Sequence, residues 1–374
     1  MLPYGRQSID DADVAAVVAA MGSDWLTTGP RVAAFEADLE AVAGAPCVTV
    51  TNGTTALHAA YAATGLTAGE EVITTPMTFV ATASGAAVLG ATVVFADVEE
   101  DTANLDPAAA EAAVTSRTRV ISAVDYAGVP ADYDRLRKIT DTAGVFLLGD
   151  AAHSIGSAYR GRPVGTLADL TTFSFFPTKN LTTGEGGAVA SIRPELLERV
   201  RDFRTVGSIR DPRRLRRADE GGWHYEVHEF GLNYRLPDVL CALGSAQLRR
   251  LAAFKARRAR LTARYDELLA DLPGLRLPAQ RSDVDPIRHL YPVRVKDGRR
   301  REVYDRLRAA GIGVQVNYIP VYWHPVFEDL GYRRGMCPVA ESFYAEELSL
   351  PLFADLTDSD QDRVVEALRG ILGS

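Results

Sequence analysis

The segment TTFSFFPTKNLTTGEGGAVASI (171–192) carries the pattern that decides the fold. It contains two apolar or β-branched runs, TTFSFF (171–176) and AVASI (188–192), with a segment rich in glycine and threonine between them. Short runs of this kind, bounded by proline and glycine, predict buried strands. We therefore expect two strands here, joined by a loop that starts where the first strand ends.

Similar runs occur along the chain before this segment. They alternate with stretches of helical apolar spacing, which predicts βαβ units around a mainly parallel sheet with helices on both faces. We expect one large α/β domain over residues 1–236. The runs are CVTV (47–50), EVITTP (71–76), VVFADV (93–98), RVISAVD (119–125) and VFLLGD (145–150).

The chain after residue 236 predicts a smaller domain. Apolar residues at helical spacing over 237–272 predict one long helix. Strand-like runs follow at 289–295 and 314–319, with an amphipathic stretch between them, and a capped helix is predicted from Thr357. We expect a small α+β domain over 237–374, in agreement with the two domains that a length of 374 residues predicts.

The composition excludes several classes of protein. With 41 basic and 49 acidic residues the net charge is -8, so we expect no nucleic-acid partner. The Arg-rich stretch RDPRRLRR (210–217) has no interleaved aromatic residues, which favours a solvated loop over a ligand contact. No apolar run is long enough for a membrane span, and the three scattered cysteines match neither a disulfide framework nor a metal motif. We expect a cytoplasmic protein with no membrane span and no metal site.

Lys179 differs from the other three lysines in its surroundings. Lys138, Lys255 and Lys296 lie among charged residues, where a solvated ammonium is expected, whereas Lys179 follows the buried run TTFSFFP. Open α/β sheets bind ligands at the carboxyl ends of their strands, and burial there lowers the pKa of an amine and makes it nucleophilic. The alternative is a loop lysine paired with Glu185.

Asp150 ends the run VFLLGD, and His153 follows on the next turn. Both are therefore expected at the same edge of the sheet as Lys179. A pyridoxal phosphate ring needs such a carboxylate, because a protonated ring nitrogen lets the ring accept the electrons of a substrate carbanion. Taken alone, Asp150 could equally cap a helix, and a single histidine is more often structural.

The segment TNGTTAL (51–57) leads from a strand into a helix. Backbone N–H groups at a helix start, with hydroxyls beside them and Gly53 allowing close approach, suit one phosphate, although a capped helix without a ligand has the same pattern. No GxGxxG motif follows the first predicted strand, and the sequence contains no GxxxxGK[ST] motif. A dinucleotide site and a P-loop therefore lose their main support. The phosphate site, the carboxylate and the lysine together predict pyridoxal phosphate as the cofactor.

These motifs resemble those of the DegT/DnrJ/EryC1/StrS family of nucleotide-sugar aminotransferases. The resemblance covers essentially the whole chain and implies a fold-type I, aspartate aminotransferase-like large domain that binds pyridoxal phosphate. It is carried by TTGPRVAAFE (27–36), TNGTTAL (51–57), GDAAHSIG (149–156), SFFPTKNLTTGEGGA (174–188) and GLNYRLPDVLCALG (231–244).

The resemblance implies catalytic roles for Lys179 and Asp150. Lys179 would bind the cofactor covalently and move a proton between the cofactor and the sugar carbon, and Asp150 would pair with the ring nitrogen. The further implied cofactor contacts are Gly53, Thr54 and Ser174 at the phosphate, Phe79 stacked on the ring, His153 at the ring hydroxyl, and Asn233 at the phosphate bound by a neighbouring subunit.

That last contact implies a homodimer with two shared active sites. Two alternatives stay open for these residues. Phe79 could be a core residue in a strand-to-helix turn, and Asn233 could cap the helix that begins near Pro237.

Five segments resemble the members of the family that aminate C4 of UDP-linked 4-keto-6-deoxy-N-acetylhexosamines on the pseudaminic acid route. They are LPYGRQSID (2–10), SDWLTTGP (23–30), VDYAGVP (124–130), RHLYPV (288–293) and VNYIPVYWHPVF (316–327). The resemblance implies L-glutamate as donor and a nucleotide-sugar acceptor. The candidate substrate contacts, which include side chains able to make charge-assisted hydrogen bonds to a diphosphate or sugar, are Arg6, Thr28, Arg288, His289 and Tyr318.

Other functions remain as alternatives. A 3-keto-sugar or cyclitol aminotransferase would use the same residues, and a pyridoxal phosphate-binding regulator without turnover would share the fold. Lys179 stands where dehydratases of the family have histidine, which favours transamination. Gly149 and Asp125 depart from the commoner family pattern, so substrate contacts near Asp125 cannot be copied from relatives.

Overall fold

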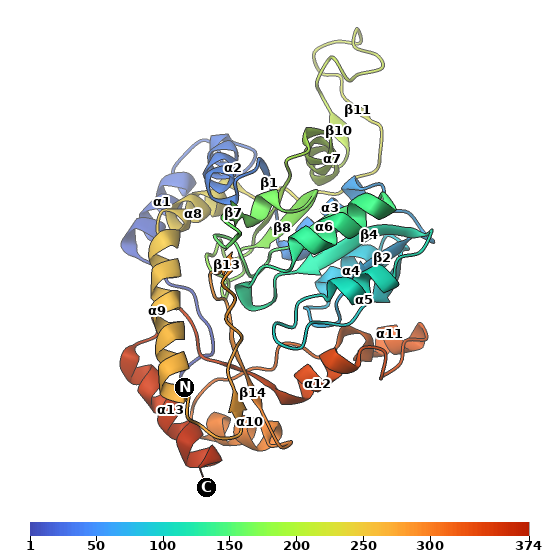
Figure 1. The fold of residues 1–374 in the computed structure, drawn as a ribbon. Helices are drawn as coiled ribbons and strands as arrows, with labels where there is room; N and C mark the ends of the chain where they lie inside the picture. Colours follow the sequence, from blue (N-terminus) through green and yellow to red (C-terminus); the bar gives the residue numbers. More distant parts are fainter. Residues whose placement is uncertain (374) are drawn as a thin grey trace.

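The central sheet of the large domain has seven strands in the order β1-β9-β8-β5-β4-β2-β3 (Figure 1). The computed structural model describes residues 1–373. Strands β8, β5, β4, β2 and β3 are parallel to one another, and β9 is antiparallel to both of its neighbours. The predicted mainly parallel sheet is confirmed, and each apolar run forms a strand: β1 (Cys47–Val50), β2 (Glu71–Thr74), β3 (Thr92–Phe95), β4 (Thr118–Val124), β5 (Phe146–Asp150), β8 (Leu170–Ser174) and β9 (Gly187–Ala190).

Side chains along each strand alternate between two hydrophobic clusters, one on each face of the sheet. In β5, for example, Leu148 belongs to one cluster and Leu147 to the other. The helices on the Leu148 face are α3 (Gly53–Ala63), α4 (Ala81–Ala87) and α7 (Pro194–Arg204). The helices on the Leu147 face are α2 (Pro30–Ala43), α5 (Pro107–Ala112), α6 (Tyr133–Ala143) and α8 (Asp238–Leu248).

The single helix predicted over 237–272 is instead two helices, α8 and α9 (Leu251–Leu269). The side chains of Gln247 and Arg250 both donate to the buried Asp13 of α1 (Asp11–Met21), at 2.6 and 2.9 Å. These contacts hold a turn at the junction of the two helices, which helical spacing alone could not indicate. The domain division at 237 stays a prediction, because α8 packs with the large-domain cluster while α9 runs to the other end of the molecule (Figure 1).

The second half of the chain contains an antiparallel sheet with helices, as expected for an α+β domain. The strands are β12 (Leu275–Arg276), β14 (Tyr291–Val295) and β15 (Glu347–Leu350). The helices are α9, α10 (Arg300–Ala309), α11 (Pro325–Asp329), α12 (Pro338–Glu346) and α13 (Asp358–Leu372). The predicted cap is present, because Asp360 N donates to Thr357 Oγ1 at 3.1 Å where α13 begins.

The run at 314–319 is not a strand, contrary to the prediction. Gln315 makes one isolated bridge to Ser349. Beyond it, Asn317 N donates to the Glu347 carboxylate at 2.7 Å, and Asn317 Nδ2 donates to Ser349 Oγ at 3.0 Å. These hydrogen bonds to side chains take the place of the main-chain hydrogen bonds that a strand would make with β15. The segment therefore turns away from β15 and brings Tyr318 to the large domain.

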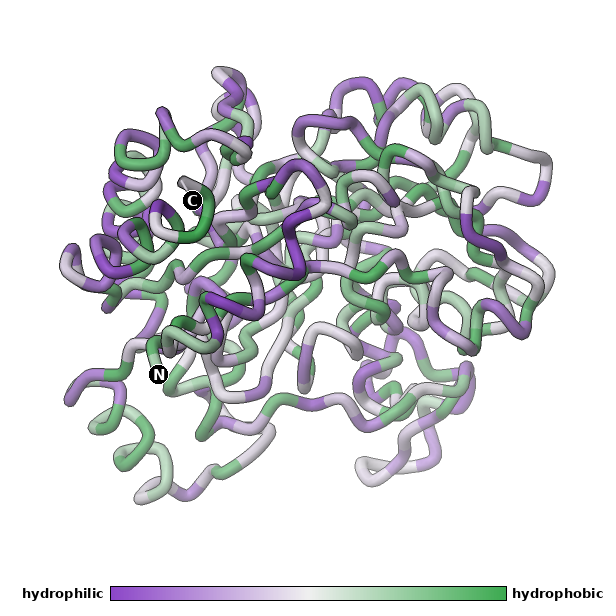
Figure 2. Tube along the Cα trace, turned by 90° about the horizontal axis from the view of Figure 1, so that it is seen from below, coloured by the Kyte–Doolittle hydropathy of each residue, from purple (hydrophilic) through white to green (hydrophobic). Residues whose placement is uncertain are grey.

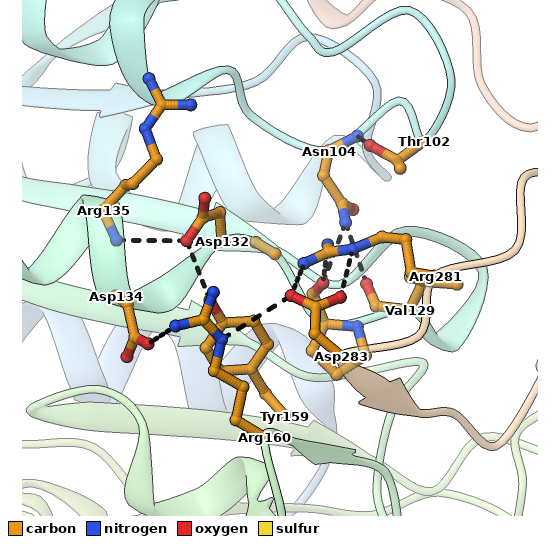
Figure 3. A network of polar contacts seen from close by, with 12 residues as sticks. Thr102, Asn104, Val129, Asp132, Asp134, Arg135, Tyr159, Arg160, Arg281 and Asp283 are labelled. Atoms are coloured by element: carbon orange, nitrogen blue, oxygen red, sulfur yellow. Dashed lines mark hydrogen bonds and ion pairs between the residues drawn. The ribbon is translucent and has the colours of Figure 1, made fainter.

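Residues 281–289 pack back onto the large domain (Figure 3). Here β13 (Val284–Asp285) pairs with β6 (Ala158–Tyr159), which pairs with β7 (Arg162–Pro163). Arg281 donates to Asp283 at 2.9 Å and to the Pro130 carbonyl at 2.8 Å. His289 N then donates to the Ala127 carbonyl at 2.9 Å, so this network fixes the approach of His289 to the large domain.

A hairpin between α7 and α8 projects from the rest of the molecule (Figure 1). Its short strands are β10 (Ser208–Ile209) and β11 (Glu226–Val227). Within the Arg-rich stretch, Arg213 pairs with Asp211 and remains strongly exposed, as expected for a solvated loop. Phe230 is 98% exposed at the base of the hairpin.

Hydrophobic and hydrophilic residues alternate along most of the trace (Figure 2). Within residues 1–373, no helix has the length and apolarity needed to cross a bilayer.

Short 3₁₀ turns complete the elements: η1 (Tyr126–Gly128), η2 (Val164–Thr166) and η3 (Val321–Trp323).

Candidate active site

A cavity of ≈ 460 Å³ lies at the carboxyl edge of the central sheet. Its lining includes the ends of β4, β5 and β8, where ligands of open α/β sheets bind. The volume falls in the range of small-molecule and cofactor sites. Predicted residues from distant parts of the chain meet in this lining: Gly53, Thr54, Phe79, Asp150, His153, Ser174, Lys179, His289 and Tyr318.

The first turn of α3 presents backbone N–H groups to the cavity. Thr55 N donates to Asn52 Oδ1 at 2.9 Å, so the helix is capped, and the amides of Gly53 and Thr54 still lack an acceptor within the helix. A Cβ added at Gly53 would lie 2.8 Å from Ser174 Cβ, so a glycine is needed for α3 to approach β8 this closely. The free amides and the helix dipole suit one phosphate at this end of the cavity.

Asp150 lies at the end of β5 and is only 5% exposed. Its Oδ2 accepts a hydrogen bond from Thr82 Oγ1 at 2.6 Å, and its Oδ1 accepts one from Ala152 N at 3.2 Å. Burial raises the pKa of Asp150, while the Thr82 hydroxyl, the Ala152 N–H and the Lys179 ammonium oppose that rise. The next element along the chain is the strand β6, so Asp150 does not cap a helix.

Lys179 lies in the loop after β8, and its side chain lines the cavity. Burial lowers the pKa of Lys179 to about 8, against the opposing effect of the Asp150 charge. Glu185 lines the same cavity, but within residues 1–373 the Lys179 amine has no hydrogen-bond or ion-pair partner. The alternative of a Lys179–Glu185 ion pair is therefore not formed, and the amine is available to a ligand.

The rings of His153 and His289 lie against each other, with centroids 4.4 Å apart and ring planes tilted by 36°. His153 Nε2 and the Tyr318 hydroxyl are 3.1 Å apart. Burial holds the pKa of both histidines well below the ordinary value, and the nearby Lys179 charge lowers both further, so both rings are neutral. Each Nδ1 is buried without a partner among the described residues, which leaves hydrogen-bonding capacity beside the cavity.

Aromatic side chains line the mouth of the cavity. Phe79 is 58% exposed, with its ring centroid 6.3 Å from that of Tyr318, so it is not the core residue of the alternative interpretation. Tyr4 also lines the cavity, and burial raises the pKa of its hydroxyl. The N-terminal segment is held in place by Leu352 N, which donates to the Tyr4 carbonyl at 3.0 Å.

Three of the predicted substrate contacts lie outside the lining of this cavity. Arg6 and Thr28 are exposed on the surface. Arg288 is buried and donates to the Ala279 carbonyl at 2.8 Å. Their contacts with a substrate stay predictions.

Asn233 also lies outside the lining. It is exposed at the base of the hairpin and forms an isolated bridge with Thr205. The N-cap of α8 is Pro237, so Asn233 does not cap that helix. Its contact with a neighbouring subunit stays a prediction.

Asp125 serves a structural role behind the site. Its Oδ2 accepts from Ser154 Oγ at 2.5 Å, and its Oδ1 accepts from the Tyr133 hydroxyl at 2.9 Å and from Ala131 N at 3.1 Å. Burial raises the pKa of Asp125 to about 7. The side chain thus fixes the turn that carries His153.

Sequence reasoning did not single out several residues of the lining, among them Tyr4, Thr78 and Thr82. One signal in the sequence could have indicated Thr78 and Thr82. They lie four residues apart in TPMTFVAT (75–82), and that spacing places two side chains on one face of a helix start.

The donor groups in the cavity fit pyridoxal phosphate. The amides of Gly53 and Thr54 suit the phosphate, the Asp150 carboxylate suits a protonated ring nitrogen, and the Lys179 amine suits the aldehyde. Within residues 1–373, no group of three or more His, Cys, Asp and Glu side chains could hold a metal ion.

Comparisons with known proteins identify the family of the chain. The model of the DegT/DnrJ/EryC1/StrS aminotransferase family matches residues 7–369. The chain is 36% identical to the UDP-4-amino-4,6-dideoxy-N-acetyl-beta-L-altrosamine transaminase of Campylobacter jejuni, over 100% of this chain and 98% of that protein.

Two solved structures share the fold over nearly their whole length. PseC of Helicobacter pylori, an aminotransferase involved in the biosynthesis of pseudoaminic acid, has a TM-score of 0.93 at 30% identity, covering 100% of this chain and 99% of that one. The PLP-form of Spr1654 from Streptococcus pneumoniae has a TM-score of 0.93 at 29% identity, covering 100% and 98%.

These findings confirm the predicted fold-type I architecture and the prediction of an aminotransferase with pyridoxal phosphate as its cofactor. The chain belongs to the DegT/DnrJ/EryC1/StrS aminotransferase family.

Proposed function

We propose that the protein transfers an amino group from L-glutamate to C4 of a nucleotide-linked 4-keto-6-deoxy-hexose, with a UDP-linked N-acetylhexosamine as the favoured acceptor. The observation that carries this proposal is the meeting of the Gly53–Thr54 amides, the Asp150 carboxylate and the Lys179 amine around one cavity. These groups come from three separate elements, and their chemistry matches the phosphate, ring nitrogen and aldehyde of one cofactor. When bound, pyridoxal phosphate supplies an electron sink for the carbanion that forms on the substrate carbon.

Asp150 holds a proton on the ring nitrogen. It sits in a buried site, where an ionised carboxylate is stabilised by a cationic partner and by hydrogen bonds. Its oxygens each receive one hydrogen bond from the protein, which leaves further acceptor capacity for the ring N–H.

Lys179 would hold the cofactor through its amine and would move the proton at the substrate carbon. With a pKa lowered to about 8, its amine is neutral in a sizeable fraction of molecules at mildly alkaline pH, unlike an ordinary lysine. A neutral Nζ can attack a carbonyl carbon and can accept a proton from the substrate carbon.

The acceptor is proposed from relatives and from the lining. The Campylobacter jejuni relative bears the name of a UDP-amino-sugar transaminase, and PseC is described as acting in pseudoaminic acid biosynthesis. Among residues 1–373, Lys179 is the one lysine or arginine in the lining, and Tyr4, Tyr318 and the neutral His289 also lie there. Neutral hydrogen-bonding groups beside aromatic rings suit a hydroxylated sugar ring.

The test is amination of a panel of acceptors with glutamate as donor. UDP- and dTDP-linked 4-keto-6-deoxy sugars, 3-keto sugars and free cyclitols would be compared, with the position of the new amine determined by NMR. Turnover of the UDP-linked 4-keto sugar supports the proposal. Turnover of only 3-keto sugars or cyclitols would replace the acceptor while leaving the cofactor roles intact.

We also propose that the working unit is a homodimer in which Asn233 reaches the cofactor phosphate of the partner. The hairpin projects from the body, and Phe230 at its base is 98% exposed, as expected for a segment that packs on another molecule (Figure 1). A two-fold arrangement would make this contact twice.

We place this reaction in the cytoplasm, with small-molecule substrates and no nucleic-acid partner. The three cysteines are free and buried, which fits a reducing compartment. The net charge of -8 opposes binding to a polyphosphate backbone.

A further inference from the structure

We propose that Thr82 is a positioning residue for Asp150, and that Thr78 orients the Thr82 hydroxyl for this task. The inference rests on the proposed pairing of Asp150 with the ring nitrogen of the cofactor. It extends that function by naming what holds the carboxylate ionised and correctly turned.

The side chains of Thr78, Thr82 and Asp150 are buried and joined by two consecutive hydrogen bonds. Thr78 Oγ1 lies 2.7 Å from Thr82 Oγ1, and Thr82 Oγ1 lies 2.6 Å from Asp150 Oδ2. Their exposures are 3%, 1% and 5%, so water does not replace these contacts. A hydrogen bond to a charged acceptor in such surroundings is stronger than one between neutral groups.

The direction of the hydrogen bonds follows from the charge on Asp150. An ionised carboxylate can only accept, so the single proton of the Thr82 hydroxyl points at Asp150. The Thr78 hydroxyl must then donate to Thr82 Oγ1. Both O–H dipoles present their positive ends to the carboxylate, which favours its ionised form.

The carboxylate is held in its plane by a second contact. Ala152 N donates to Oδ1 at 3.2 Å, so each oxygen has one protein partner. This arrangement fixes the rotation of the Asp150 side chain and leaves acceptor capacity for the ring nitrogen.

The backbone at the start of α4 is placed for this role. Tyr61 of α3 donates its hydroxyl to the Thr82 carbonyl at 2.9 Å. Since α3 also presents Gly53 and Thr54 at its first turn, one helix ties the phosphate end of the site to the residue that orients Asp150.

A purely structural threonine would use its hydroxyl differently. Threonines in helices commonly return their hydroxyl to a main-chain carbonyl one turn earlier. Thr82 Oγ1 is instead bonded to the Thr78 and Asp150 side chains. The hydroxyl is therefore committed to the carboxylate and not to its own helix.

The experiment uses holoenzyme reconstituted with pyridoxal phosphate labelled with ¹⁵N at the ring nitrogen. NMR would follow the protonation of that nitrogen against pH in the wild type and in Thr82→Val, Thr82→Ser, Thr78→Val and Asp150→Asn, and the apparent Kd for the cofactor would be measured for each. Val keeps the shape of Thr and removes the hydroxyl, whereas Ser keeps the hydroxyl. The substitutions at Thr82 and Thr78 do not change the other titratable groups that interact with Asp150. These groups are Lys179, Asp125, Tyr61, Tyr133 and Tyr318.

We expect Thr82→Val to lower the pH at which the nitrogen loses its proton by about one unit, a tenfold change, and to weaken cofactor binding about tenfold. Thr78→Val should act in the same direction by a smaller amount, and Thr82→Ser should titrate like the wild type. A merely structural role would change thermal unfolding or Kd without moving the nitrogen titration.

Three outcomes would overturn the inference, and they are distinguishable. If Asp150→Asn shifts the nitrogen titration but folded Thr82→Val does not, Thr82 does not position Asp150. If Asp150→Asn also leaves the titration unchanged, the pairing in the proposed function is wrong and the inference falls with it. If Thr82→Val does not fold, an unshifted titration in Thr78→Val decides against the inference.

Discussion

Gly53→Ala tests the phosphate site through one added methyl group. The new Cβ would lie 2.8 Å from Ser174 Cβ and 3.0 Å from Ser174 Oγ, whereas ordinary contact begins at 3.4 Å. The start of α3 must therefore move away from β8 by a few tenths of an ångström. In the apoenzyme, α3 and β8 can move apart and relieve the clash. Cofactor binding requires the α3 amides and Ser174 to surround one phosphate, so we expect the clash to weaken the affinity for the cofactor.

The expected loss follows from the cost of overpacking. Added methyl groups in packed sites cost about 1–3 kcal/mol, which corresponds to cofactor binding weakened by about 5- to 150-fold. Titration of the apoenzyme with pyridoxal phosphate, followed by absorbance, gives the Kd. Gly370→Ala is the matched control, because an added Cβ there has nothing within 4 Å and the site is exposed in α13.

The double variant Gly53→Ala, Ser174→Gly identifies the source of the loss. Removing the Ser174 side chain makes room for the new methyl group, so the double variant should bind better than the sum of the two single losses predicts. Additive losses would show that Ser174 is not the obstacle. A Kd for Gly53→Ala within about twofold of the wild type would refute the argument that α3 and β8 meet around the phosphate.

Four further predictions concern Lys179, Asp150 and Asn233. Borohydride reduction of the holoenzyme should attach the cofactor to the peptide that contains Lys179, and label on Lys138, Lys255 or Lys296 would contradict the assignment. In the apoenzyme, modification of Lys179 by an amine-reactive reagent should rise with pH through a midpoint at about 8, because burial lowers the pKa and only the neutral amine reacts; a midpoint near that of an exposed lysine would argue against a buried amine. Asp150→Asn should slow the glutamate half-reaction by orders of magnitude, followed by cofactor absorbance in stopped flow, and near-normal rates would refute its role. Mixing inactive Lys179→Ala with an inactive Asn233 variant should restore activity through heterodimers that contain one intact site, whereas no recovery after demonstrated subunit exchange would mean that each subunit builds its site alone.

The sequence could indicate the strand ends because there the buried run and the reactive residue are adjacent in the chain. Asp150 ends one apolar run and Lys179 comes three residues after another, so their meeting at one sheet edge follows from topology. The spacing of Thr78 and Thr82 indicates that two hydroxyls share one face, but it does not identify Asp150 as the partner of Thr82, because Asp150 lies 68 positions further along.

The two wrong predictions of secondary structure have a similar cause. The turn between α8 and α9 depends on Asp13, which is 234 positions from Gln247. The run at 314–319 has the composition of a strand, but the Glu347 side chain takes the Asn317 N–H that a ladder would use. In both places a tertiary contact overrides the local preference.

The cavity draws its lining from Tyr4 near the start of the chain to Tyr318 in the second half. During synthesis on the ribosome, the nascent chain cannot enclose the cofactor until the segment around residue 318 has emerged, even though the Gly53 turn and Lys179 are made much earlier. Once the cavity has formed, cofactor at a concentration a hundredfold above its Kd stabilises the native state by about 2.7 kcal/mol. Because the bound cofactor stabilises only the native state, we expect the enzyme without it to unfold more readily and to be cleaved faster by proteases.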